Sequence, residues 1–151
     1  MSAATHLSPD ESPAQKSPRI GREYATHVAN TLESIGFAII ERNARHVSGI
    51  EMDLLCSTPD GRMLAIECKG SDETARTPGM VRTDNYWKVL GYVNEIVTWR
   101  AYGDLSQDIR YVLVTSHLPA PNTPWGRGLN QQVLLGNLSI VCIPFPTKEH
   151  Q

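Results

Sequence analysis

Two short strands joined by a tight turn constrain this chain more than any other feature of its sequence. Residues 50–57 read IEMDLLCS and residues 63–69 read MLAIECK, and both runs have the residue types and alternation of β-strands. Pro59, Asp60 and Gly61 lie between them and favour a tight turn. The two runs are therefore predicted to form an antiparallel hairpin, around which the rest of the chain must be placed.

The segments on both sides of the hairpin predict an α/β fold. Apolar residues recur every three to four positions over residues 20–35, and Gly36 follows as a stop, so a helix is expected there. The remaining expected elements are a strand over 37–43, a helix over 83–102, a strand over 109–116, a short helix over 129–136 and a strand over 138–145. The order is α-β-β-β-α-β and then α-β, which predicts a central mixed sheet flanked by helices.

Three details of these elements can be compared with a structure. The last two strands are unbroken apolar runs, which is typical of strands buried on both faces. Thr83 or Asp84 is expected to cap the long helix, and close packing on the sheet would explain Gly91 inside it. Trp125 and Arg127 are expected in a flexible, proline-rich loop over 117–128.

The composition indicates one domain. The chain has 151 residues, of which 40% are hydrophobic and 20% charged, as is ordinary for a single globular core. Residues 1–19 carry three prolines and almost no large apolar side chain, so we expect a disordered N-terminal tail and a single domain over 20–151. The sequence has no apolar run of about 20 residues and no secretory signal. We therefore expect a cytoplasmic protein without membrane contact.

The charge balance and the cysteines exclude two classes of protein. Fourteen Lys and Arg stand against sixteen Asp and Glu, a net charge of −2, which excludes a protein that holds nucleic acid through bulk positive charge. Cys56, Cys68 and Cys142 are far apart and form no C-x-x-C pair. We therefore expect buried free thiols, and no zinc or iron–sulfur site.

Acidic side chains alternate along the hairpin. Glu67 and Lys69 project from one face of their strand, and Glu51 and Asp53 share a face of the preceding strand. In a hairpin, Asp53 and Glu67 come close enough to hold one metal ion. Clustered carboxylates need a compensating cation, and Mg²⁺ with oxygen ligands supplies one. With a lysine beside it to steady a phosphate or orient water, the pattern predicts metal-assisted phosphodiester hydrolysis. A lone Glu-x-Lys also fits an ion pair on a solvated strand.

The same hairpin resembles the catalytic signature of the PD-(D/E)xK nuclease superfamily, which has the restriction-endonuclease-like fold. The residues that carry the resemblance are Gly49-Ile50-Glu51-Met52-Asp53-Leu54-Leu55 and, after the turn, Ala65-Ile66-Glu67-Cys68-Lys69-Gly70. The segment over 21–70 is most similar to Holliday junction resolvase-like and Mrr-like nucleases. The resemblance extends over about residues 21–115, and Met52 stands where the proline of the signature would be.

The resemblance implies roles for the residues of this signature. Asp53 and Glu67 would bind the metal, the backbone carbonyl of Cys68 would add a third oxygen, and Lys69 would be the catalytic lysine. The implied activity is a Mg²⁺-dependent endonuclease that hydrolyses DNA phosphodiester bonds in a resolvase-like, restriction or repair role, with Mn²⁺ able to substitute.

Two further glutamates match the family. Glu23 corresponds to a glutamate early in the first helix, which can contact a metal through water or complete a second site, so it is a catalytic candidate. Its alternative is a solvated helix position. Glu51 corresponds to the glutamate two residues before the aspartate and is a weaker metal-ligand candidate.

Four cations are candidates for DNA binding, with solvated surface charges as the alternative for each. They are Arg45, Arg82, Lys88 and Arg127. DNA is the expected partner, and a homodimer is expected because two sites are needed to cut both strands. A larger defence, repair or phage assembly is a further possibility. The alternative function is a catalytically weak or inactive nuclease fold used for DNA binding or assembly; RNA cleavage is a third possibility.

Overall fold

The computed structural model describes residues 13–45, 49–72, 74–103 and 109–146. Its elements are α1 (Pro13–Ser34), β1 (Ala38–Arg45), β2 (Glu51–Ser57), β3 (Met63–Lys69), the 3-10 helix η2 (Gly79–Val81), α2 (Thr83–Ala101), β4 (Arg110–Thr115), α3 (Pro124–Leu134) and β5 (Ser139–Cys142). The predicted order of helices and strands is confirmed. For β1 to β4 and for α2, the predicted ends lie within about two residues of those observed.

The five strands form one mixed sheet in the order β1-β2-β3-β4-β5. β1 pairs with β2, and β2 with β3, in antiparallel orientation, so the predicted hairpin is present. β3 pairs with β4, and β4 with β5, in parallel orientation. At the turn of the hairpin Gly61 has a φ of 87°, a left-handed conformation that favours glycine.

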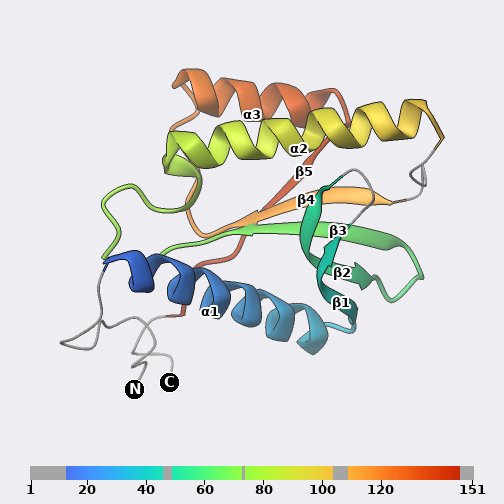
Figure 1. Cartoon of the computed structure of the whole chain (residues 1–151), viewed down its shortest axis with the longest axis horizontal. Coiled ribbons are helices and arrows are strands. Elements are labelled where there is room, and N and C mark those ends of the chain that lie inside the picture. The colour runs from blue at the N-terminus through green and yellow to red at the C-terminus, as the bar shows by residue number, and fades with distance from the viewer. Residues whose placement is uncertain (1–12, 46–48, 73, 104–108, 147–151) are drawn as a thin grey trace.

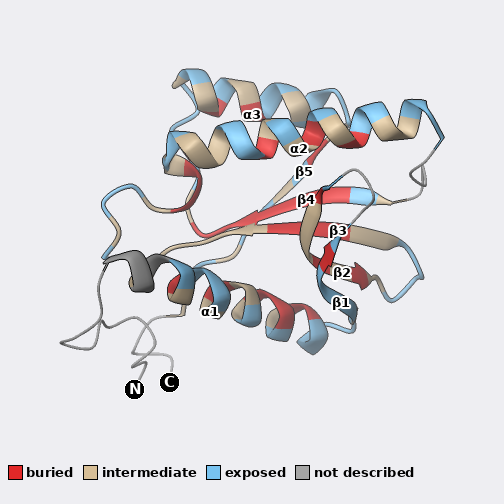
Figure 2. Ribbon diagram, viewed as in Figure 1, coloured by how far each residue is buried: buried red, intermediate tan, exposed pale blue. Residues whose placement is uncertain are grey.

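Helices cover both faces of the sheet. Figure 1 shows α1 on one face and α2 and α3 on the other. The core under α1 is built on Tyr24 and Val28 of the helix and on Leu54 and Ile66 of the sheet. The second core lies under α2 and α3, and Figure 2 shows burial concentrated in β3 and β4, between the two helical layers. The two middle strands are thus held from both sides.

The first helix begins earlier than the sequence indicates. α1 starts at Pro13, not at residue 20, so the expected tail boundary differs from the structure; residues 1–12 lie outside the described residues. A proline is tolerated in the first turn of a helix because its missing N–H has no partner there. Lys16 of this early turn donates a hydrogen bond from Nζ to Thr74 Oγ1 at 2.6 Å, which ties α1 to the loop after β3.

The short helix α3 also begins early, so the expectation of a flexible loop around Trp125 and Arg127 is wrong. α3 starts at Pro124, and the Thr123 side chain caps it by accepting a hydrogen bond from the Gly126 N–H at 3.1 Å. The threonine followed by proline is a cap and a first helical residue rather than a loop signal.

Four smaller expectations are wrong. β5 is an edge strand paired only with β4, so Val141 is 45% exposed rather than buried on both faces. For the same reason Cys142 is exposed, whereas Cys56 is buried as expected. The N-cap of α2 is Arg82, without a side-chain cap. Gly91 is exposed, with open space where a Cβ would be, so close packing does not explain it.

The described part of the chain contains no helix that is long and apolar enough to cross a membrane.

Gly70, which follows β3, gives a test of the packing that holds the end of this strand. A Cβ on Gly70 would lie 2.1 Å from the ring of the buried Tyr24, whereas a Cβ on Gly91 would meet nothing. We expect Gly70→Ala to lower the free energy of unfolding by about 1 to 3 kcal/mol through overpacking. Gly91→Ala, the control, should raise it by about 0.5 to 1 kcal/mol because alanine favours the helix.

Urea denaturation of both variants checks this prediction. Equal midpoints for Gly70→Ala and the unchanged protein would show that the backbone of β3 is not held against α1 as described.

Candidate active site

Two carboxyl groups meet where β2 and β3 separate. The antiparallel pairing ends at Leu54 and Ile66, and the next residues along the two strands are Asp53 and Glu67. Asp53 Oδ2 accepts a hydrogen bond from the backbone N–H of Cys68 at 2.7 Å. The carboxyl groups of Asp53 and Glu67 are hydrogen-bonded to each other. The structure therefore brings Asp53 and Glu67 together, as expected from the predicted hairpin.

Glu67 is a buried acid whose surroundings favour its protonated form. Only 3% of the residue is exposed. Burial, the hydrogen bond with Asp53 and the charge of Asp53 together raise the pKa of Glu67 far above its ordinary value. A protonated Glu67 would donate to the Asp53 carboxylate, because a charged Glu67 would be buried beside a like charge.

Lys69 is the cation nearest this pair along β3. Its Nζ lies 3.9 Å from Glu67 Oε2, and its side chain is 19% exposed. The backbone carbonyl of Lys69 accepts a hydrogen bond from Thr115 Oγ1 at 2.6 Å, which fixes the end of β3 against β4. Lys69 is thus placed by the sheet and reaches both the carboxyl pair and solvent.

Tyr92 of α2 faces the carboxyl groups, and the sequence did not indicate that this residue belongs to the site. Burial, followed by the charges of Glu67, Asp53 and Glu51, raises the pKa of Tyr92. The residue follows Lys88 by four positions and so lies on the same side of the helix. Glu51 lies close enough to raise the pKa of Glu67 as well, and it forms an ion pair with Arg45 at 3.1 Å.

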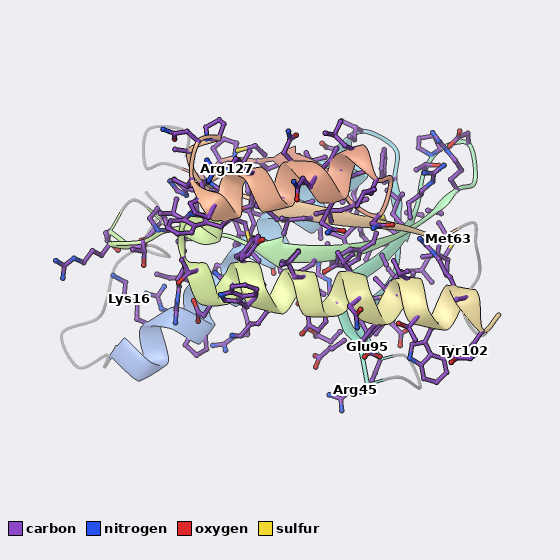
Figure 3. The ribbon with its side chains drawn as sticks, turned by 90° about the horizontal axis from the view of Figure 1, so that it is seen from above. Lys16, Arg45, Met63, Glu95, Tyr102 and Arg127 are labelled. Carbon is purple, nitrogen blue, oxygen red and sulfur yellow. The ribbon has the colours of Figure 1, made fainter. Side chains whose placement is uncertain are left out.

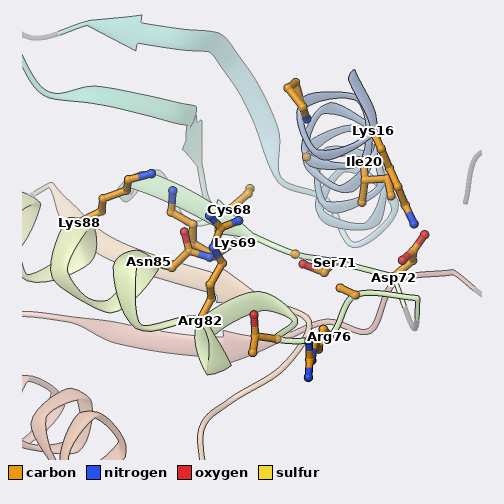
Figure 4. A pocket seen from close by; sticks show the side chains of 15 residues that line it. Lys16, Ile20, Cys68, Lys69, Ser71, Asp72, Arg76, Arg82, Asn85 and Lys88 are labelled. Carbon is orange, nitrogen blue, oxygen red and sulfur yellow. The ribbon is translucent and has the colours of Figure 1, made fainter. Parts of the chain in front are cut away.

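A hollow of about 560 Å³ opens at the end of β3, and we call it the basic hollow. It is lined by Lys16 of α1, Cys68 and Lys69 of β3, the loop after β3, and the start of α2. Figure 4 shows Lys69, Arg82, Asn85 and Lys88 gathered on one side and Lys16 with Asp72 at the other. Its cationic side chains are Lys16, Lys69, Arg76, Arg82 and Lys88.

Two of the four predicted DNA-binding residues line this hollow, and two do not. Arg82 and Lys88 contribute to its wall, and Arg82 is also paired with Asp84 at 2.7 Å. Arg45 is paired with Glu51, and Arg127 donates to the backbone carbonyl of Asn122 from α3. Figure 3 shows Arg45 and Arg127 away from Lys16 of the hollow.

Glu23 is not brought to the carboxyl pair. Its carboxylate is paired with Arg19, with Oε1 3.0 Å from the guanidinium. Glu23 lines a separate hollow on the far side of α1, together with His27 and Pro146. Helical periodicity explains this placement, because Tyr24, the next residue, faces the sheet.

The donor set around Asp53 can be compared with the needs of a metal. No group of three His, Cys, Asp or Glu side chains in the described residues is arranged to hold a metal ion. Two hydrogen-bonded carboxyl groups are nevertheless oxygen donors that suit Mg²⁺, and a backbone carbonyl or water can complete its shell. A cation bound here would take the place of the proton that the raised pKa of Glu67 favours.

Comparison with known proteins gives a fold. No protein-family model and no curated protein matches the chain. The structure of an EndoMS–dsDNA complex matches with a TM-score of 0.50 and 18% identity, over 95% of this chain and 48% of that chain. The crystal structure of a repair endonuclease from Pyrococcus abyssi matches with a TM-score of 0.46 and 18% identity, over 93% and 50%. The chain thus spans about half the length of these solved chains. The likeness to the EndoMS complex shows a shared fold.

The raised pKa of Glu67 predicts how stability depends on pH without metal. The unfolded pKa of a glutamate is about 4.3, and the folded pKa lies far above it. Folding therefore favours the protonated form, and the free energy of unfolding falls as pH rises above about 5. Glu67→Gln keeps a donor to Asp53 without a titrating group, so at about pH 8 it should be more stable than the unchanged protein by about 1 to 3 kcal/mol.

Urea denaturation in EDTA across pH 5 to 8 measures this difference, with the exposed Glu33→Gln as the matched control. A parallel pH dependence in Glu67→Gln and the unchanged protein would contradict a buried protonated Glu67.

Proposed function

We propose that this chain is a Mg²⁺-dependent endonuclease of the PD-(D/E)xK type that hydrolyses phosphodiester bonds of DNA. The observation that carries the proposal is the hydrogen-bonded pair of Asp53 and Glu67, with Lys69 between this pair and the basic hollow. Buried like charges destabilise a fold, so a domain without a function for them would not need this cluster.

Asp53 and Glu67 would hold the metal, with the Cys68 backbone carbonyl as a third oxygen donor. The Cys68 N–H fixes Asp53 Oδ2, so this carboxylate is oriented before any metal arrives. Glu51 adds negative charge near the pair, and its ion pair with Arg45 holds it at the end of β2. A bound Mg²⁺ supplies a Lewis acid for the phosphate and lowers the pKa of a coordinated water.

Lys69 would steady the scissile phosphate and orient the attacking water. Its ammonium group lies beside Glu67 and lines the basic hollow, so it can contact a phosphate there without leaving the carboxyl pair. Arg82 and Lys88 would hold the phosphates on either side through charge. Cutting both strands of a duplex would require two such sites, so we propose that two chains act together.

A second function, DNA binding without cleavage, is favoured by one observation. The described residues offer no third ligating side chain at the carboxyl pair. A fold that binds DNA through the basic hollow alone would need neither metal nor hydrolysis, and a cleavage assay separates the two functions.

We expect the purified chain to cleave plasmid or branched DNA with Mg²⁺ or Mn²⁺ and not with EDTA. Asp53→Asn and Lys69→Ala should each lower the rate at least about 100-fold, because one removes a metal ligand and the other a charge beside the phosphate. Glu33→Gln is the matched surface control.

Each outcome of this assay decides something. Equal cleavage by the two variants would contradict the assigned site, and no cleavage of any DNA would leave the non-catalytic function. RNA substrates run beside the DNA test the choice of nucleic acid.

Glu23 provides a separate prediction, because the structure pairs it with Arg19 and not with the carboxyl pair. We expect Glu23→Gln to keep cleavage within about fivefold of the unchanged protein, since a partly exposed ion pair within one helix contributes little. A loss as large as that of Asp53→Asn in the same assay would show that Glu23 reaches the metal site during the reaction.

A further inference from the structure

The basic hollow concentrates charge in a chain that is acidic overall. Five of the fourteen Lys and Arg residues line it, although the chain has a net charge of −2. These five come from α1, β3, the loop after β3 and α2, which only the fold brings together. Like charges gathered in one concave site repel one another, so the arrangement favours an anionic ligand with several negative charges.

The size of the hollow restricts that ligand. A volume of about 560 Å³ is that of a small-molecule site, about 300 to 1,000 Å³. One or two nucleotides fit such a space, so the hollow holds a short stretch of one strand.

The lining also lacks the groups that recognise bases. Among the fifteen described residues that line the hollow none is aromatic, so it has no platform on which a base could stack. Ser71, Thr77 and Asn85 add hydroxyl and amide groups that suit phosphate oxygens.

The carboxylate of Asp72 disfavours phosphate groups at one end of the hollow. Asp72 is 1% exposed, and its Oδ1 accepts hydrogen bonds from the backbone N–H and the hydroxyl of Thr74. Among the described residues its Oδ2 has no hydrogen-bond partner, and a carboxylate here repels a phosphate. Figure 4 shows Asp72 beside Lys16 at the end of the hollow away from Lys88. Phosphates are therefore favoured along Lys69, Arg82, Lys88 and Arg76.

We propose that the basic hollow holds consecutive phosphate groups of a single nucleic-acid strand and reads none of its bases. The inference rests on the proposed function for its link to the carboxyl pair, since Lys69 belongs to both. It adds that the choice of substrate at this site depends on the backbone of one strand and not on its sequence.

Fluorescence anisotropy in EDTA at low salt tests the proposal without cleavage. The probes are labelled single strands of about eight nucleotides: an adenine strand, a thymine strand and a strand of abasic residues. We expect the three to bind within about twofold of one another, because only the backbone is held. Binding of the abasic strand that is tenfold weaker or more would overturn the proposal, since the bases would then be read.

Variants locate the binding. Arg76→Ala and Lys88→Ala should each weaken binding of all three strands about three- to tenfold and reduce the slope of log affinity against log salt by about 0.7. Arg110→Ala is the matched control: it removes an exposed cation at the start of β4, the opposite end of the sheet from Lys69. Unchanged binding by both hollow variants, or an equal loss with Arg110→Ala, would overturn the proposal.

Two more arms identify the source of the phosphates. Tripolyphosphate should displace the strands, and a 5′-phosphate should change the affinity less than about twofold, because internal phosphates are held. A strong preference for the phosphorylated end would assign the hollow to strand ends and overturn the proposal. Because these binding assays involve no cleavage, a negative result would contradict backbone binding in the hollow but not the proposed hydrolysis. Conversely, a protein that binds the backbone as proposed but cleaves no DNA would contradict only the proposed hydrolysis.

Discussion

The contact between the carboxyl groups of Asp53 and Glu67 is the interaction around which the candidate site is organised. It forms because β2 and β3 stop pairing at Leu54 and Ile66, which leaves the next two side chains facing each other. The Cys68 N–H fixes Asp53, and the burial of Glu67 disfavours a charge on both groups at once. The pair must therefore share either a proton or a cation, and a divalent metal is the cation whose chemistry two carboxyl groups suit.

The fold places this pair at the edge of a binding surface. β3 lies in the middle of the sheet, held by the core under α1 on one face and the core under α2 and α3 on the other. Its end is where the first turns of α1, the loop after β3 and the start of α2 converge, and these segments supply the cations of the basic hollow. Lys69 is the last residue of β3 and joins the two parts, since it lies beside Glu67 and lines the hollow.

The hairpin could be predicted because its signals are local. Strand alternation and the turn at Pro59-Asp60-Gly61 together place Asp53 opposite Glu67, and no distant residue is needed to make them meet. Placements that depend on tertiary contacts could not be predicted. Lys16, which the sequence places in the tail, reaches the hollow through its hydrogen bond to Thr74. Glu23 pairs with Arg19 on the side of α1 that faces away from the sheet. The approach of Tyr92 to the carboxyl groups depends on how α2 packs on the sheet, which the sequence does not show.

Calorimetric titration of the protein with Mn²⁺ in buffers of different ionisation enthalpy tests the central claim most directly. If the metal replaces the proton shared by Asp53 and Glu67, binding at about pH 7 should release close to one proton for each metal ion bound, and Glu67→Gln should abolish that release. Metal binding without proton release, or no binding at millimolar Mn²⁺, would contradict the assignment of this carboxyl pair as the metal site.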